Sequence, residues 1–497
     1  MQLAIRKPFA AVAATALLAL GSVSCQESAL NPVPQTQISD KVAFDTPTRV
    51  ALQVNNLYSF VKTGNFLGGR FQIYNDIRAD EFINLTSNAV TGSTVWNHTE
   101  TETNANDVAN CWIFGYQAIN QVNVFLAGLD DNASKFVAPT FPSTFAATAN
   151  QYRGEARLLR ALCYYSLLQL YAQPYNKNAG ASPGLPLRLL AEKSAANNSL
   201  ARSSVADVYT QILADLKFAE DNLPASYGDA ATNVTRAHRN TAIALKTRVY
   251  LSMGNYASVA TEAAKIVPST APYVAANGGV ANGLNSSVAA VFAPPQTTNE
   301  SILSFPFTAN DQPGTQNQLA YYYLPASLGG GGEYSLNTAT GIIANAAFAA
   351  TDARRTNFVV TTTAGTFLKK YPTGTPYTDN APVIRYAEVL LNLAEARART
   401  STTVDAQALA LLNAVRGRSN PAGVYASFAS PTELVNAILL ERRIEFLGEG
   451  LRNIDLMRTL SPIPAKGIVK EIPTTDPLYI WPIPQVELSA NPAMTRN

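Results

Sequence analysis

The chain has 497 residues, of which 47% are hydrophobic and 14% are charged. A chain of this length and composition can bury a large core, as one large domain or two interleaved ones. Its 37 basic residues include Arg6 and Lys7, which lie in a segment that we expect to be removed, so the mature chain would hold 35 residues of each sign. Such a balance argues against nucleic acid or an acidic membrane surface as a partner.

The first 24 residues have the features of a secretory leader. Arg6 and Lys7 precede a short apolar run over residues 9–20, and small residues follow. The run is too short to span a membrane as a mature helix, and its flanks are those of a signal peptide. We therefore predict a signal peptide over residues 1–24.

Cys25 follows small residues at the point where a bacterial lipobox places its acylated cysteine. Ser22 stands where leucine is common in that motif. We predict lipid attachment at Cys25 and a polar tether over residues 25–45, with ordinary secretion and an incidental cysteine as the alternative. Cys111 and Cys163 sit in apolar, helix-like runs, so we expect them to be buried small hydrophobic residues rather than a disulfide.

Helical periodicity dominates the chain after residue 45. Thr46 and Pro47 are typical of a helix start, and Ser204 is a plausible N-cap with Asp207 in the first turn that follows. Before residue 225, we predict helices over about 47–61, 106–126, 151–171 and 205–222.

Residues 241–267 form the clearest supersecondary unit. A first helical run stops at Gly254 and Asn255, and a second begins at once with Tyr256. Glycine permits a left-handed backbone at such a turn, and the tyrosine can wedge between two antiparallel helices. This pattern is typical of a tetratricopeptide pair. Residues 383–399 and 404–416 suggest a second pair, and residues 438–447 a further helix.

Two irregular stretches, over residues 64–105 and 268–380, are predicted to form a loop-rich lobe packed on the helices. A flat aromatic ring can cover the apolar face of a sugar while polar groups bond its hydroxyls. The candidate ligand-binding residues in these stretches are Tyr74, Asp76, Arg78, Asp80, Trp96, Asn97, Tyr321, Tyr322 and Tyr323. The alternative for each of them is that it only packs the lobe.

The sequence offers few residues that could support catalysis or bind a metal ion. His98 and His238 lie far apart without a nearby ligand partner, so no metal or cofactor is predicted. The run of four glycines over 329–332 lacks the lysine of a phosphate loop, and we interpret it as a flexible turn. A glycoside hydrolase would need two carboxylates that face each other across the substrate. Asp76, Asp80 and Glu81 lie close together in the sequence, but this proximity does not establish such an arrangement.

The segment over residues 438–458 concentrates charge among regularly spaced apolar residues. Charges held beside a core need partners, because an isolated buried charge is very costly. We predict structural ion pairs here, formed largely among the charges of this segment. The residues concerned are Glu441, Arg442, Arg443, Glu445, Glu449, Arg452 and Asp455.

Several segments together carry a family resemblance. They are YRGEARLLRALCYYSLLQLYAQPY (152–175), RAHRNTAIALKTRVYLSMGNY (236–256), PVIRYAEVLLNLAEARA (382–398), LLNAVRGR (411–418), ERRIEFLGEGLRNIDLMR (441–458) and IWPIPQVELSANPAMTRN (480–497). With the lipobox, they resemble the SusD/RagB family of surface lipoproteins, which partner TonB-dependent outer-membrane transporters in Bacteroidetes. Arg496 stands where glutamine is usual in that family.

The resemblance implies a mainly α fold, with tetratricopeptide-like helix pairs in a right-handed superhelical scaffold and a single domain over residues 46–497. It also implies a non-catalytic protein, anchored by lipid on the outside of the outer membrane. Such a protein captures oligosaccharides, or in some members peptides, and delivers them to a SusC-like transporter. Peptide capture, glycoside hydrolysis and scaffolding without a small ligand are the alternatives.

Overall fold

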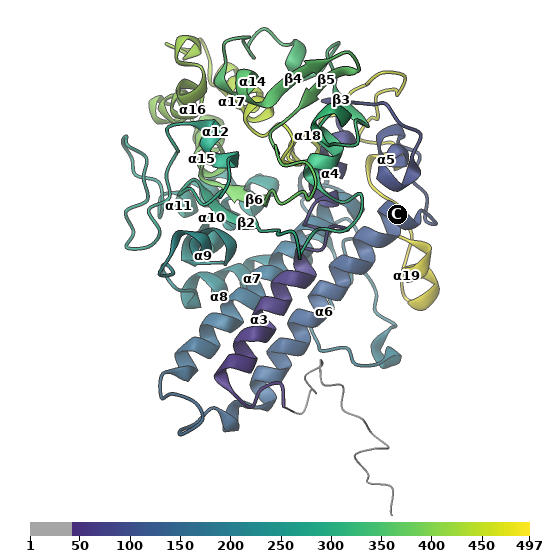
Figure 1. The fold of residues 1–497 in the computed structure, drawn as a ribbon, viewed down its shortest axis with the longest axis vertical. Coiled ribbons are helices and arrows are strands. Elements are labelled where there is room, and N and C mark those ends of the chain that lie inside the picture. The colour runs from purple at the N-terminus through teal and green to yellow at the C-terminus, as the bar shows by residue number, and fades with distance from the viewer. Residues whose placement is uncertain (1–41) are drawn as a thin grey trace, which may run out of the picture.

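The protein is described by a computed structural model over residues 42–497, and the predicted signal peptide, Cys25 and most of the tether lie outside this range. The described chain is mainly helical (Figure 1). Its longer helices are α3 (Pro47–Val61), α6 (Asn110–Asp131), α7 (Phe145–Tyr171), α8 (Val205–Asn222), α10 (Arg239–Ser252), α15 (Tyr386–Thr400), α16 (Ala406–Ser419) and α17 (Pro431–Glu445). Within residues 42–497, no helix is both long and apolar enough to cross a membrane.

Local capping signals explain where several helices begin. Thr46 caps α3 at the predicted helix start. Ser204 is the N-cap of α8, as predicted, and it forms a capping box with Asp207. Helix α7 begins at Phe145, six residues earlier than the periodicity indicated. The ring of Phe145 packs on Phe136 and Phe141, with centroids 5.0 and 4.5 Å away, so tertiary contacts stabilise this extra turn and a half.

The predicted helix pair over 241–267 is present as α10 and α11 (Tyr256–Ala263). Gly254 adopts a φ of +68° between them, and the side chain of Asn255 caps α11. Helices α15 and α16 form the second predicted pair. In Figure 1, α3, α6, α7 and α8 run side by side through one half of the molecule, and α15, α16 and α17 lie in the other half.

The loop-rich stretches contain short elements rather than continuous loops. In these stretches they are α4 (Arg70–Ile77), β1 (Phe82–Asn84), α5 (Ser93–Asn97), α12 (Val288–Phe292), β2 (Ser301–Phe305), α13 (Leu319–Tyr323), β3 (Tyr334–Leu336), α14 (Ala353–Phe358), β4 (Val359–Thr362) and β5 (Gly365–Leu368). Short elements elsewhere in the described chain include α9 (Ala230–Thr235), β6 (Ala381–Arg385), α18 (Arg452–Arg458) and α19 (Gln485–Ala490). The strands form three antiparallel pairs, β1–β3, β2–β6 and β4–β5.

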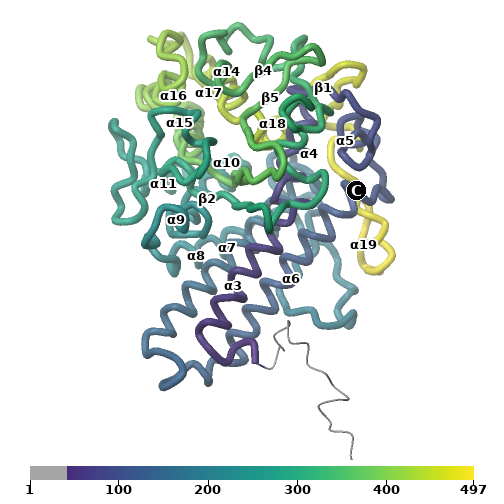
Figure 2. Tube along the Cα trace, viewed as in Figure 1, coloured from purple at the N-terminus to yellow at the C-terminus, as the bar shows by residue number. Residues whose placement is uncertain are grey.

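The early segment around α4 lies against the C-terminal segment around α18, as Figure 2 shows. The amide of Asn453 donates to Asn75 Oδ1 over 3.1 Å, and the backbone N–H of Gly450 donates to Asp76 Oδ2 over 3.0 Å. The first irregular stretch is therefore held in place by residues almost 400 positions later in the chain.

A buried network of ion pairs joins the scaffold to the loop-rich stretches. Glu445 lies within 3.1 Å of the guanidinium groups of Arg354, Arg385 and Arg418, and its side chain is fully buried. These three cations hold the pKa of Glu445 well below its usual value against the opposing effect of burial. The carboxylate is therefore charged and fully paired inside the protein.

Each of the seven charged residues singled out in the C-terminal segment has an oppositely charged partner within 4 Å. Only Arg442 and Asp455 pair with each other inside that set. The outside partners are Arg354, Lys370, Arg385, Arg416, Arg418, Asp80, Glu81 and Arg458. The charges are thus arranged to tie distant segments to α17 and α18 rather than to stabilise one helix.

Candidate functional site

Most of the residues that the sequence suggested for ligand binding are buried. Seven of the nine are at most 5% exposed, namely Tyr74, Asp76, Arg78, Asp80, Trp96, Tyr322 and Tyr323. Asn97 is half-buried, but its amide donates to the carbonyl of Ser93 within α5. Tyr321 is the one aromatic residue of the set that is half-exposed. In this structure the seven buried side chains do not reach solvent, so Tyr321 is the residue around which a site can be built.

The buried members hold the lobe together through polar contacts. Arg78 pairs with Glu100 over 2.8 Å, and Asp80 pairs with Arg443 and Arg452. Asp80 and its neighbour Glu81 are both tied to arginines, so these carboxylates do not offer an acid and a base to a substrate. The lobe therefore has a polar core of its own. Hydrophilic residues of the irregular segments supply the hydrogen-bond and ion-pair partners that its buried polar groups need.

Asp76 is a buried carboxyl that should make stability depend on pH. Its Oδ2 accepts from Tyr323 over 2.7 Å, and burial raises its pKa to about 8, above its value near 3.9 in an unfolded chain. Deprotonation is therefore harder in the folded protein, and stability falls as pH rises between those two values. From pH 6 to pH 9 we expect a loss of about 2 to 3 kcal/mol from this group. Urea unfolding at both pH values should show a smaller loss in Asp76→Asn, and an equal loss in both proteins would contradict this assignment.

Trp96 supports the lobe from within. Its Nε1 donates to the carbonyl of Phe82 over 2.8 Å, and the Lys466 ammonium lies 5.5 Å from its ring centroid. We expect Trp96→Phe to lower the free energy of unfolding by about 1 to 3 kcal/mol, because the Phe82 carbonyl loses its partner. Affinity for a ligand, measured well below the melting temperature, should stay within about twofold of wild type. A large drop in affinity with unchanged stability would instead place Trp96 in the ligand site.

Two half-exposed tyrosines form the candidate site, which we call the tyrosine platform: Tyr321 and Tyr377 with Gln316 and Glu333. The rings of Tyr321 and Tyr377 lie 6.2 Å apart at an interplanar angle of 74°. The two residues are 56 positions apart, and nothing in the sequence around Tyr377 distinguished it from an ordinary loop tyrosine. Sequence reasoning therefore found one half of the pair only.

The glycine run beside Tyr321 fixes the platform. The N–H of Gly331 donates to the Tyr321 carbonyl over 2.7 Å, and the hydroxyl of Tyr377 donates to the Gly329 carbonyl over 2.7 Å. A Cβ added at Gly331 would lie 2.9 Å from Cζ of Tyr321. The glycines were interpreted as a flexible turn, but here they let the backbone pass close to the ring.

Polar groups line one edge of the platform. The amide of Gln316 donates to the Tyr321 hydroxyl over 3.3 Å, and Oε1 of Glu333 lies 3.5 Å from the same hydroxyl. Oε2 of Glu333 is buried and has no hydrogen-bond partner among the described residues. Gln316 and Tyr377 both have a φ of +58°, a left-handed conformation that is costly for residues with a side chain. The surrounding structure therefore holds both residues in this conformation.

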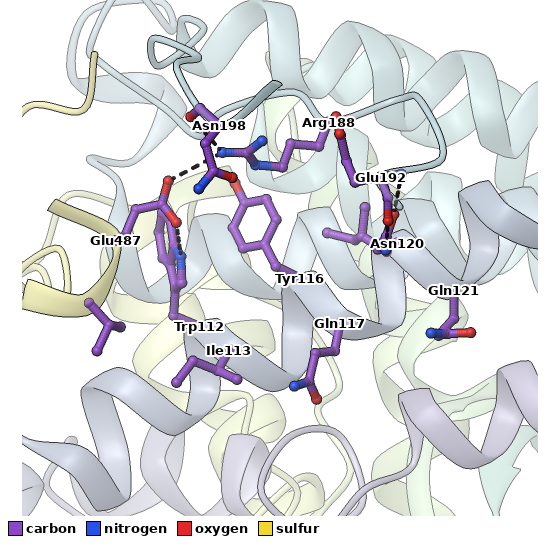
Figure 3. A pocket seen from close by; sticks show the side chains of 12 residues that line it. Trp112, Ile113, Tyr116, Gln117, Asn120, Gln121, Arg188, Glu192, Asn198 and Glu487 are labelled. Atoms are coloured by element: carbon purple, nitrogen blue, oxygen red, sulfur yellow. Dashed lines mark hydrogen bonds and ion pairs between the residues drawn. The ribbon is translucent and has the colours of Figure 1, made fainter. Parts of the chain in front are cut away.

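A second surface feature is a groove of about 380 Å³ beside α6, between this helix, the segment 186–198 and α19 (Figure 3). Arg188 and Glu487 point toward one another across it, with 3.6 Å between Nη2 and Oε1. Trp112 Nε1 donates to Oε2 of Glu487 over 3.1 Å, and the Tyr116 hydroxyl donates to the Pro186 carbonyl over 2.9 Å.

The aromatic rings of this groove are less suited to a sugar. Trp112 is 2% exposed, and its centroid lies 4.8 Å from that of Tyr116, so the two rings cover each other. The polar groups of Arg188, Glu487, Trp112 and Tyr116 are already paired within the protein. The groove presents the amides of Gln117 and Gln121 rather than a free ring face. The tyrosine platform is thus the better candidate for a carbohydrate.

Known proteins similar to this chain share its architecture. The family model described as starch-binding and associating with the outer membrane matches residues 32–251, and the SusD family model matches residues 307–497. A SusD superfamily protein from Bacteroides fragilis is 33% identical with a TM-score of 0.80, covering 91% of this chain and 99% of that one.

Two more distant relatives have similar coverage. A SusD-like protein of Formosa agariphila is 23% identical in an alignment that spans 97% of each chain. A laminarin binding SusD-like protein is 22% identical with a TM-score of 0.69, covering 91% of this chain and 99% of the other. The full-length structural match at 33% identity and the two family matches, together with the helical scaffold and loop-rich lobe, show that this chain belongs to the SusD family.

Proposed function

We propose that the protein captures an oligosaccharide on the tyrosine platform and delivers it, chemically unchanged, to a SusC-like TonB-dependent transporter. The observation that carries this proposal is the pair of half-exposed rings of Tyr321 and Tyr377, edged by the side chain of Gln316. Two rings at a steep angle can contact an apolar sugar face and its edge.

The relatives support a carbohydrate as the cargo. One matching family model is described as starch-binding, and one structural relative is named for laminarin binding. Both descriptions concern polymers of neutral sugars, whose recognition needs ring faces and hydrogen-bonding groups rather than countercharges. The tyrosine platform has this composition.

The proposed placement is the outer face of the outer membrane, with lipid on Cys25 as the anchor. The family description associates these proteins with the outer membrane. In this arrangement the helical scaffold docks on the transporter, and the loop-rich lobe presents the ligand to it. The anchoring step is tested by copurification of the transporter with the lipidated chain. Cys25→Ser should lose this copurification only when the variant also loses its attachment to the membrane.

The binding experiment uses the chain from Gln26 with a panel of polysaccharides, including laminarin and starch, and a panel of peptides. Retention by one glycan class supports the proposal and identifies the cargo. Peptide-only retention would overturn it in favour of peptide capture. Chemically altered glycan, seen as new reducing ends, would overturn the non-catalytic role.

A further inference from the structure

Arg355 stands at a second cavity in the loop-rich lobe, with a volume of about 510 Å³. Its polar lining comes from Thr338, Asn345, Arg355, Thr361 and Thr366, and the residues that line it include no aspartate or glutamate. Cavities of this size accommodate small ligands or single groups of larger ones. Neither the proposed function nor the comparisons assign it a role.

The guanidinium of Arg355 is fixed in orientation but only partly used. Nη1 donates to the carbonyls of Ile343 over 3.1 Å and Phe348 over 2.8 Å, and the group lies 5.8 Å from the centroid of the Phe348 ring. Nε and Nη2 donate to no residue of the described range 42–497. A guanidinium that is held on one side and free on the other is prepared to bind a planar or tetrahedral anion.

The positive charge of Arg355 is also unopposed. Most arginines of the described chain lie within 4 Å of a carboxylate, and the adjacent Arg354 contacts three of them. Arg355 has no carboxylate within that distance among the described residues. Its charge therefore remains available in a cavity whose other lining groups are neutral.

Two hydroxyls complete the site. Thr361 and Thr366 are directly paired across β4 and β5, and their hydroxyl oxygens lie 3.1 Å apart. A hydroxyl can donate one hydrogen bond to an anion while it accepts another. The antiparallel pairing of β4 and β5 holds both hydroxyls at the same rung, and both residues line the cavity together with Arg355.

We propose that this cavity, the Arg355 site, binds an acidic substituent of a glycan, the carboxylate of a uronic acid or a sulfate ester. Both groups present oxygens that match the free N–H groups of Arg355 and the threonine hydroxyls. The assignment of this acidic group to a glycan rests on the proposed function. The anion site itself does not, so the two can fail separately.

The test compares wild type with Arg355→Gln by isothermal titration against three probes: oligogalacturonate, a sulfated carrageenan oligosaccharide and neutral laminarin oligosaccharides. We expect affinity for at least one acidic probe to fall about tenfold or more, which corresponds to the loss of one charge-assisted hydrogen bond. Affinity for laminarin should not change. The wild-type affinity for the acidic probe should also weaken with salt, and the salt dependence should be smaller in the variant.

Matched variants show whether a loss of affinity comes from the lost charge or from a folding defect. Arg49→Gln removes the same charge from a guanidinium that also bonds a backbone carbonyl, on α3, and should leave all affinities unchanged. Arg355→Lys keeps the charge and should retain part of the preference for the acidic probe. Inorganic sulfate, titrated alone, should bind wild type more tightly than Arg355→Gln.

Equal affinity of wild type and Arg355→Gln for both acidic probes and for sulfate would overturn the Arg355 site. If no glycan of any class binds while sulfate still distinguishes the two proteins, the anion site stands and the glycan-capture function fails. If laminarin binds and no anion distinguishes the proteins, the function stands and the Arg355 site fails.

Discussion

Glu445→Ala is expected to lower the free energy of unfolding by about 3 to 5 kcal/mol, the range observed when one partner is removed from a buried ion pair. Three guanidinium groups, of Arg354, Arg385 and Arg418, converge on this carboxylate. Without Glu445, these three buried guanidinium groups have fewer carboxylates to pair with. The cost of keeping each cation away from water is then offset less fully. The truncation also leaves a small cavity at the end of α17. Urea unfolding at pH 7 measures the change directly.

The control for this prediction is Glu471→Ala, which makes the same substitution at an exposed glutamate outside the ion-pair network. Its effect should be within about 0.5 kcal/mol of zero. If Glu445→Ala were as mild as the control, the network would have to rearrange around the lost carboxylate. That outcome would contradict the view that the three arginines depend on Glu445.

Tyr321→Ala is expected to weaken glycan binding about thirtyfold or more, because the alanine removes one of the two rings that form the platform. Truncation of a central aromatic contact commonly costs about 2 kcal/mol or more in binding free energy. The fold should tolerate the change, since the ring is half-exposed and stands at the surface of the lobe. Isothermal titration with the glycan retained in the panel experiment gives the affinity.

Two further variants separate stacking from other effects. Tyr321→Phe keeps the ring and removes only the hydroxyl near Gln316 and Glu333, so its loss of affinity should be much smaller. Tyr273→Ala removes a half-buried tyrosine elsewhere in the same lobe and should leave affinity unchanged. Unchanged affinity in Tyr321→Ala and Tyr377→Ala together would exclude the tyrosine platform as the ligand site.

The neighbours Tyr321, Tyr322 and Tyr323 show how far sequence reasoning could go toward the site. All three were candidates because they are aromatic and lie in an irregular stretch. The short helix α13 turns Tyr322 and Tyr323 into the core, where both are 0% exposed, and leaves Tyr321 at the surface. Its partner Tyr377 comes from another loop. Which of the three rings is buried depends on packing partners that are distant in the sequence. A single sequence does not reveal those partners.

The ion pairs show the same division between local and distant information. Their residues could be recognised from the sequence, since charges among buried apolar positions need partners. The partners could not, because Glu445 meets Arg385 across 60 positions and Arg443 meets Asp80 across 363. Charge pairing between separate segments is decided by the way the segments pack.

By itself, the sequence determined the helical class, the capped starts of α3 and α8, the turn at Gly254 and the family resemblance. These features depend on local interactions: capping, periodicity and backbone conformations that neighbouring residues specify. Which aromatic rings face solvent and which charges pair can be learned only from the folded structure. The reason is physical, because burial and pairing are properties of contacts between distant segments, and those contacts exist only after the chain has folded.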